Sequence, residues 1–161
     1  MIRNVHERSI PADAEAAGVL LDGLGRPGDR LWPSQFRYPM VLDAPLGVGA
    51  DGGHGPIRYH VVEYEPGRRA RFAFHRGVGI EGFHELEIQA LPGGRCRMRH
   101  VLMGRTRGRM RLLFPVLVEP LHDAVIEDLF DNAERELTGG VRCPARHPAW
   151  VRHWSRKERR R

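Results

Sequence analysis

The chain has 161 residues, of which 41% are hydrophobic and 29% charged, as expected for one globular domain with a substantial core. It contains no apolar run long enough for a membrane-spanning helix, and its first residues lack the pattern of a secretory signal. Two cysteines, Cys96 and Cys143, are too few for a disulfide framework or a zinc site, so we expect a protein of the reducing cytoplasm.

The net charge of +6 is concentrated at the C-terminal end. Residues 141–161 hold eight of the 26 basic residues and one acidic residue, whereas residues 1–140 hold 18 basic and 19 acidic residues. We therefore divide the chain into a ligand-binding domain at 1–140 and a basic tail at 141–161. The domain itself is not predicted to bind nucleic acid.

The first predicted elements are a strand over residues 2–10 and a short helix. Pro11 and the acids that follow it are typical of a first helical turn. The apolar residues at helical spacing are Ala16, Ala17, Leu20, Leu21 and Leu24. Gly25 and Pro27 end this helix, and a connection broken by prolines follows.

From Met40 onward the pattern predicts short strands joined by Gly/Pro turns, which pair antiparallel with their neighbours. The expected strands are 40–46, 57–65, 69–75, 83–91 and 95–104. Residues 47–56 are expected to form a glycine-rich turn. On the last strand Arg95, Arg97 and Arg99 alternate with inward side chains, and Glu85 and Glu87 are expected to face these arginines.

Residues 110–138 change to helical periodicity, with apolar residues advancing by threes and fours. Pro115 and Pro120 indicate a helix that begins at or near Pro120, or is kinked there. Gly139 and Gly140 end it. The element order is thus a strand, a short helix, a meander and a long terminal helix.

This order resembles the START-like, or SRPBCC, superfamily, which includes the birch-pollen allergen and polyketide cyclases. The resemblance covers residues 2–139 and is strongest at 59–69, 82–87 and 120–128. It implies an α+β helix-grip fold, in which a curved antiparallel sheet of about six or seven strands wraps around the long C-terminal helix. It also implies a cavity for lipids, polyketides or other apolar molecules, with catalysis in only some members.

Physical argument independently favours such a cavity. A twisted sheet of about six strands curls, and one helix ~10–12 Å across does not fill its concave side. Large side chains either complete a solid core or leave a cavity. The residues we expect to contact a ligand are Tyr59, Val61, Phe72, Phe74, His84, Leu86, Met98, His100, Leu102, His122, Ile126 and Leu129.

His84 and His100 are the candidate chemical groups within this set. Strand alternation places both on the concave face, where same-face neighbours of paired strands lie ~4.5–8 Å apart. Such a pair can hydrogen-bond a ligand carbonyl or hydroxyl, or act as acid and base. The alternative is a pair of buried histidines bonded to each other or to water. His122 is expected to look inward from the first turns of the terminal helix.

Three further sequence features do not predict a nucleotide, metal or thiol site. Residues 47–52 spell the dinucleotide-binding fingerprint, but a strand and not a helix follows them. A metal site that joins His122 to Glu127 or Asp128 fails because these offsets diverge around a helix. Cys96 is expected to be an inert core residue. We therefore expect no cofactor and no metal.

The tail carries Trp150 and Trp154 among its arginines, which would suit contact with an anionic surface such as lipid or nucleic acid. A solvated, weakly ordered end is the preferred interpretation.

Three functions remain open from the sequence. The preferred one is binding or carriage of a small hydrophobic molecule, lipid or polyketide-like. The second is a polyketide aromatase/cyclase or dehydratase, in which His84 or His100 moves protons. The third is a partner-binding module with a vestigial cavity and a docking tail.

Overall fold

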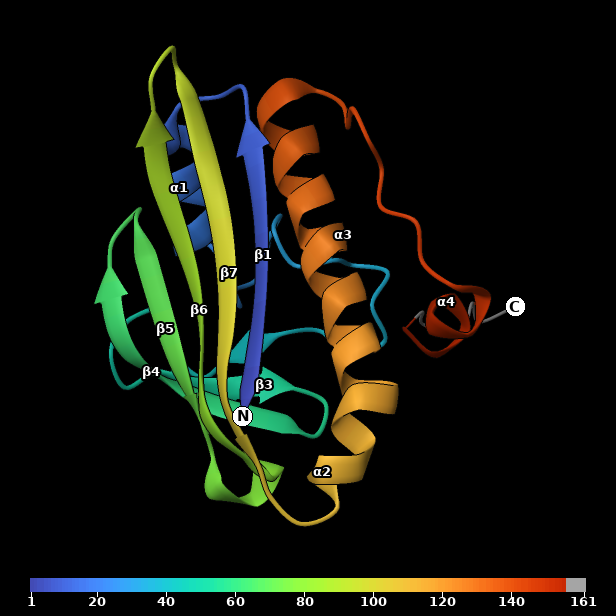
Figure 1. Cartoon of the computed structure of the whole chain (residues 1–161). Coiled ribbons are helices and arrows are strands. Elements are labelled where there is room, and N and C mark those ends of the chain that lie inside the picture. The colour runs from blue at the N-terminus through green and yellow to red at the C-terminus, as the bar shows by residue number, and fades with distance from the viewer. Residues whose placement is uncertain (156–161) are drawn as a thin grey trace.

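The computed structural model describes residues 1–155, and within them a curved antiparallel sheet of seven strands wraps around a long helix (Figure 1). The strands are β1 (Ile2–Ile10), β2 (Val41–Leu42), β3 (Asp51–His54), β4 (Ile57–Glu65), β5 (Arg69–Phe74), β6 (Ile80–Leu91) and β7 (Arg95–Thr106). Their order in the sheet is β1-β7-β6-β5-β4-β3-β2. The expected α+β helix-grip class is confirmed.

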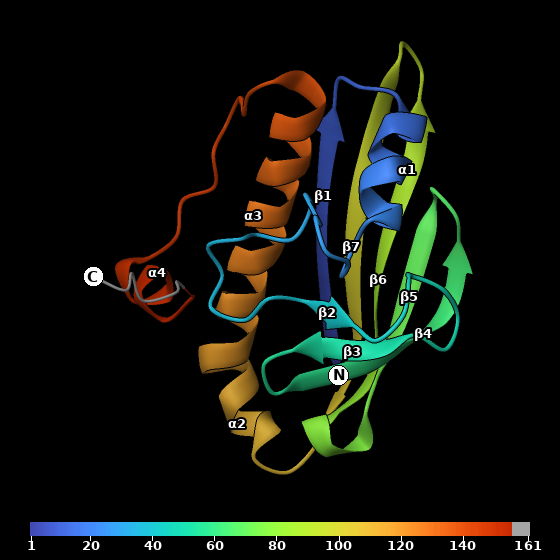
Figure 2. The same ribbon diagram turned by 180° about the vertical axis from the view of Figure 1, so that it is seen from behind.

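The helices are α1 (Ala14–Asp22), α2 (Met110–Leu113), α3 (Glu119–Thr138) and α4 (Ala149–Ser155). A 3-10 turn, η1 (Arg76–Val78), precedes β6, and a π-helical turn, η2 (Phe114–Val118), joins α2 to α3. Figure 2 shows α1 and α3 on the same side of the sheet. The main core lies between these layers and includes the fully buried Ile10, Leu21, Phe72, Met98 and Phe130. Over residues 1–155, no helix is long and apolar enough to cross a membrane.

The segment before β4 differs from the sequence prediction. The strand expected over residues 40–46 shrinks to the two residues of β2, and the expected glycine-rich turn contains β3. The glycines that suggested a turn permit close strand packing here, because a Cβ on Gly52 would lie 2.0 Å from the carbonyl oxygen of Val41. The sixth strand likewise begins three residues earlier than expected, at Ile80.

The C-terminal helical region begins earlier than its strongest periodicity indicates. α3 starts at Glu119 with Pro120 in its first turn, as predicted, but α2 and η2 extend the helical path back to Met110. Proline suits a first turn because its missing N–H would have no partner there. Gly139 ends α3 in the left-handed conformation that favours glycine.

The predicted pairing of Glu85 and Glu87 with the arginines of β7 holds for one of them. Glu87 lies opposite Arg99, with 3.9 Å between charged groups. Glu85 is opposite Val101 on β7, and it accepts a 2.7 Å hydrogen bond from Arg71 on the other neighbouring strand. The register of β6 therefore divides its two carboxylates between β5 and β7.

The described part of the tail, residues 141–155, packs along α3, contrary to the expected solvated end. Acidic residues on α3 bind it in three places: Glu134 accepts from Arg142 at 3.2 Å, Asp131 from the Ala145 amide at 2.9 Å, and Asp128 lies 2.7 Å from His147. Val151 on α4 is buried. The remaining basic residues of the tail, Arg156 to Arg161, lie outside the described residues, as does any anionic contact through them.

Candidate functional site

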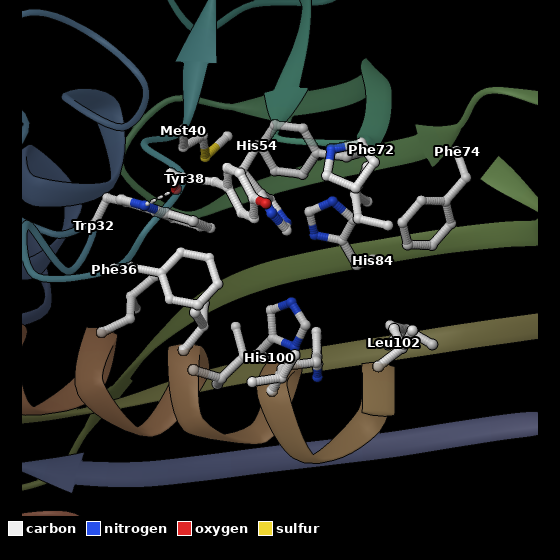
Figure 3. Close-up of a pocket in the computed structure, with 18 of the residues that line it drawn as sticks. Trp32, Phe36, Tyr38, Met40, His54, Phe72, Phe74, His84, His100 and Leu102 are labelled. Carbon is white, nitrogen blue, oxygen red and sulfur yellow. Dashed lines mark hydrogen bonds between the residues drawn. The ribbon is translucent and has the colours of Figure 1, made fainter. Parts of the chain in front are cut away.

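A cavity of about 320 Å³ lies between the concave face of the sheet and α3 (Figure 3). Strands β3 to β7 supply one wall, and α3 with η2 supplies the opposite one. The segment 23–40, which connects α1 to β2, and Trp154 of α4 complete the enclosure. Its volume is at the lower end of the ~300–1,000 Å³ typical of small-molecule sites.

Nine of the twelve residues that we expected to contact a ligand line this cavity. They are Phe72, Phe74, His84, Leu86, His100, Leu102, His122, Ile126 and Leu129. The other three, Tyr59, Val61 and Met98, are buried in the adjoining core. Whether the nine contact a ligand stays a prediction. Strand alternation and helical periodicity placed them correctly because both rules are local.

The segment 23–40 contributes aromatic side chains that the sequence interpretation missed. Trp32, Phe36 and Tyr38 line the cavity together with Met40, and the Trp32 indole N–H donates to the Tyr38 carbonyl at 3.1 Å. Figure 2 shows this segment reaching across to α3, where Asn132 donates to the Leu31 carbonyl at 3.2 Å. Aromatic residues in a proline-broken connection were the available signal, but such a segment has no periodicity that assigns a direction to its side chains.

His54 was also missed, because the sequence placed it in a turn. It is the last residue of β3, and its ring lies 5.0 Å from that of Trp32 and 5.9 Å from that of Tyr59. Burial and the neighbouring His122 lower the pKa of His54 to about 3.

His84 and His100 meet on the concave face, as alternation predicted. Their ring centroids are 5.6 Å apart, and His84 stacks on Phe72 with the ring planes within 9° of parallel (Figure 3). Tyr59 approaches His84 edge-on, with 4.6 Å between ring centroids. Leu86 is directly opposite His100 on the paired strand, so the two histidines are diagonal neighbours.

Three polar atoms of this group lack hydrogen-bond partners within residues 1–155: His84 Nε2, His100 Nδ1 and the Tyr59 hydroxyl. The proposed bond between the two imidazoles is therefore not formed through these nitrogens. A buried polar group without a partner costs ~1–3 kcal/mol relative to a satisfied one. His84 and His100 line the cavity, whereas Tyr59 lies in the adjoining core, so the two histidines are the candidates for contact with a bound molecule.

His84 and His100 of the cavity wall are uncharged near neutral pH, whereas Arg37, which also lines the cavity, carries a positive charge. Burial, reinforced by the neighbouring His122, lowers the pKa of both His84 and His100 well below 6.5. In the adjoining core, burial likewise raises the pKa of Tyr59, which keeps its hydroxyl protonated. A neutral imidazole offers one donor and one acceptor, so this wall suits uncharged polar groups better than carboxylates or ammonium groups.

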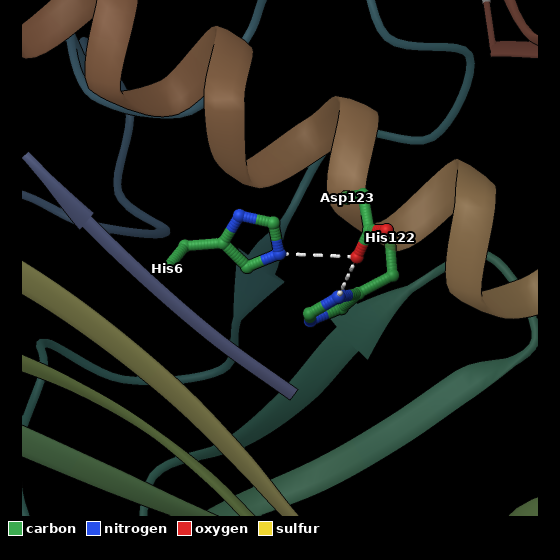
Figure 4. A group of neighbouring side chains, drawn as sticks. All are labelled: His6, His122 and Asp123. Carbon is green, nitrogen blue, oxygen red and sulfur yellow. Dashed lines mark hydrogen bonds and ion pairs between the residues drawn. The ribbon is translucent and has the colours of Figure 1, made fainter. Parts of the chain in front are cut away.

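His122 lies next to His100, on the side of the cavity nearest β1. It lines the cavity 5.0 Å from the ring of His100, and its own ring lies 6.2 Å from that of His6. His6 on β1 bridges two carboxylates of α3. Its Nε2 is 3.0 Å from Asp123 (Figure 4), and its Nδ1 is 2.7 Å from Glu127. Burial lowers the pKa of His6, but these two carboxylates outweigh it and raise the pKa to about 9.

The contacts of His6 belong to a polar ladder between β1 and α3, which we define as Asn4, His6 and Arg8 with Asp123, Glu127 and Asp131. Two residues along a strand advance ~6.6 Å, and four along a helix ~6 Å, so the two series stay in step. This matching of spacing was present in the sequence, but it becomes visible only once β1 is known to pack against α3.

Comparison with solved structures finds this fold in proteins of low sequence identity. Norcoclaurine synthase from Thalictrum flavum matches with a TM-score of 0.61 at 14% identity, over 86% of this chain and 96% of that one. A solution structure from Thermobifida fusca matches at 0.63 and 15%, over 92% of this chain and 100% of that one. CalU16 from Micromonospora echinospora matches at 0.54 and 14%, over 85% and 79%.

At these identities the likeness establishes the fold alone, which is a helix-grip fold. A scan of protein-family models and a search of curated proteins find no match to this chain.

Proposed function

We propose that this protein binds a small, mostly apolar molecule that carries an uncharged polar group, such as a hydroxyl or a carbonyl. The observation that carries the proposal is a largely apolar cavity whose wall includes His84 and His100, each with an unpartnered nitrogen. Phe72, Leu102 and Leu129 supply apolar contact, and the two imidazoles fix the orientation of the polar group. Lipid and polyketide-like molecules both satisfy this description.

A solved structure that shares the fold supports an aromatic ligand. It is a complex of norcoclaurine synthase with dopamine and hydroxybenzaldehyde, of which hydroxybenzaldehyde carries an uncharged hydroxyl and carbonyl, whereas dopamine also carries a charged amine. In the present chain the aromatic rings of Trp32, Phe36 and Phe74 line the same cavity as the imidazoles. Aromatic pairs of this kind contribute ~0.5–1.5 kcal/mol beyond the burial of their area.

A fluorescence titration tests the proposal with three probes of equal ring size. We expect 2-naphthol to bind more tightly than naphthalene, which lacks the hydroxyl, and than 2-naphthoate, which is charged. Replacing His84→Phe should bring the affinity for 2-naphthol close to that for naphthalene. Equal binding of all three probes, or an unchanged preference in the variant, would contradict the proposed role of the imidazoles.

The natural ligand requires a second measurement. Native mass spectrometry of the purified protein, followed by extraction, should recover a mainly apolar molecule with few ionised groups. Recovery of a strongly anionic molecule would contradict the proposal.

Catalysis is the second candidate function, and the geometry of the two histidines favours it. Two neutral imidazoles 5.6 Å apart, each with an unpartnered nitrogen, can donate to one atom of a ligand and accept from another. This suits the proton transfers of a cyclase or dehydratase acting on a polyketide-like chain. With the extracted molecule as substrate, the catalytic hypothesis requires turnover that His100→Phe abolishes, whereas a carrier shows no turnover at all.

A further inference from the structure

Three side chains form a cluster where β1 meets α3, and one of them, His122, also lines the cavity. His6, His122 and Asp123 each present one donor atom, and these atoms all lie within 4.8 Å of one another (Figure 4). Asp123 Oδ1 is 3.0 Å from His6 Nε2 and 3.7 Å from His122 Nδ1. Two imidazoles and a carboxylate are a donor set typical of Zn²⁺ and similar divalent ions.

Hydrogen bonding explains only part of this cluster. The distance between His6 and Asp123 suits a hydrogen bond, but that between His122 and Asp123 is too long for one. His122 Nδ1 is buried and has no hydrogen-bond partner in the part of the chain that the structure describes. It nevertheless lies on the side of the ring nearest Asp123, where a shared ion would satisfy it.

The spacing of the donors suits a metal ion. Zn²⁺ binds nitrogen and carboxylate oxygen at ~2.0–2.2 Å, so neighbouring ligands around it are roughly 3–3.5 Å apart. The separation of 3.0 Å between Asp123 and His6 is at the lower end of that range, and the 3.7 Å between Asp123 and His122 is slightly above it. The two histidine nitrogens lie within 4.8 Å of each other, so side-chain adjustments, mainly of His122, would close the site.

Outer contacts already orient two of the three ligands. Glu127 lies 2.7 Å from His6 Nδ1, which leaves Nε2 directed at Asp123, and the Asn4 amide donates to Asp123 at 2.8 Å. A carboxylate behind a metal-binding histidine is the usual way to fix its tautomer and orientation. Arg8 contacts Glu127 and so neutralises the outer carboxylate while it leaves Asp123 free of a guanidinium.

We propose that His6, His122 and Asp123 bind a divalent transition-metal ion, such as Zn²⁺, at the edge of the cavity. The ion would lie next to the ligand chamber, because His122 is a residue of the cavity wall. This inference goes beyond the proposed ligand binding and does not depend on it.

A second cluster, Asp51, His60 and His75, provides the comparison within the same molecule. Here the His75 side chain is 41% exposed, whereas those of His6 and His122 are 14% and 16% exposed; the two carboxylates, Asp51 and Asp123, are similarly exposed at 36% and 41%. The guanidinium of Arg58 also lies 3.2 Å from Asp51, where its positive charge opposes a cation. The His6 cluster is therefore the stronger candidate.

The test uses the untagged full-length protein, freed of metal with a chelator and titrated calorimetrically with Zn²⁺. Co²⁺ titration, followed by visible absorption, reports the nitrogen and oxygen ligands directly. We expect one ion to bind at the His6 cluster, His122→Ala to weaken binding by at least about 10-fold, and Glu127→Gln by about 10–100-fold. Circular dichroism checks that each variant is folded.

The control variant is His75→Ala, which should leave binding at this site unchanged. His122→Ala is the decisive variant, since His122 Nδ1 has no hydrogen bond within residues 1–155 to lose. Asp123→Asn provides a second variant that keeps the size of the side chain. The proposal is overturned if the wild-type protein binds no ion, if His122→Ala binds as well as wild type, or if His75→Ala abolishes the signal.

Discussion

At the scale of single residues, the cavity wall retains polar atoms that a purely structural core would not need. His84 Nε2 and His100 Nδ1 are buried without partners within the described chain, at a cost of ~1–3 kcal/mol each. An apolar ring in place of His84 would remove that cost and still stack on Phe72. The folded protein is therefore less stable than it would be with apolar side chains at these positions, but it keeps imidazole nitrogens that can hydrogen-bond a ligand.

The buried His84 should make the stability of the protein depend on pH. Burial lowers its pKa well below 6.5, so near that pH the unfolded chain binds a proton that the folded chain does not. The contribution of His84 is thus fully present above pH ~6.5 and declines as the pH falls. In His84→Phe we expect a shallower loss of unfolding free energy between pH 7 and 5, by up to about 1.4 kcal/mol per pH unit.

Urea unfolding at several pH values measures this difference. His153→Phe, at an exposed position of α4, is the matched control and should keep the wild-type slope. An unchanged slope in His84→Phe would show that His84 takes up its proton in the folded protein.

The sequence predicted the positions of some of these residues and missed others. Alternation was enough to place His84 and His100 on one face, because a strand side chain's direction follows from its position alone. His6 also belongs to a strand that was predicted, but its importance depends on α3, more than 110 residues further along the chain. His54 and Trp32 occupy segments whose backbone direction no local rule specifies.

At the scale of elements, glycine allows two backbones to pack closely at the outer side of α1. A Cβ on Gly18 would lie 2.5 Å from the carbonyl oxygen of Gly67, in the turn between β4 and β5. The same turn is held by Asp22 at the end of α1, which accepts from the Gly67 amide at 2.7 Å and from the Tyr64 hydroxyl at 2.8 Å. Gly18 therefore sets the distance between α1 and the sheet.

Replacing Gly18→Ala should destabilise the protein even though alanine is the better helix former. The clash is with backbone atoms, which cannot rotate away, so we expect a loss of about 1–3 kcal/mol in unfolding free energy. Val19→Ala is the control: it improves helix propensity at an exposed neighbour and should be neutral or slightly stabilising. Chemical denaturation measures both. Stabilisation by Gly18→Ala would show that the helix and the turn separate easily.

The limits of a helix or strand were predictable where a periodic pattern of apolar residues ended at glycine or proline. α3 and β4 have both, and their predicted limits agree with the structure within a few residues. β2 and β3 have neither, because glycine in a closely packed strand resembles glycine in a turn. The packing of residues 141–155 on α3 involves hydrogen bonds from Arg142 and the Ala145 amide to acidic residues of α3, which the composition of the segment does not indicate.

At the scale of the whole molecule, the cavity links folding to ligand binding. A molecule that binds the folded chain alone stabilises it by about 2.7 kcal/mol at a concentration 100 times its Kd. For a domain of this size, that corresponds to a rise of roughly 5–10 °C in Tm. We expect 2-naphthol to produce such a rise in a thermal unfolding experiment.

A cavity-filling variant provides the control for this prediction. Leu121→Trp places a larger side chain on the cavity wall and should remove the effect of 2-naphthol on Tm. An equal rise in the variant and the wild type would mean that the probe binds elsewhere.

The enclosure is divided between two kinds of support. The imidazoles of His84, His100 and His122 project from paired strands and a long helix, whereas Trp32, Phe36 and Trp154 come from a connecting segment and a short terminal helix. These two outer pieces are joined where the Arg37 amide donates to the Ser155 carbonyl at 2.6 Å. Substitutions at Trp32, Phe36 and Trp154 can therefore change the shape of the cavity, and so the ligand that it accepts, without moving the histidines on the sheet and α3.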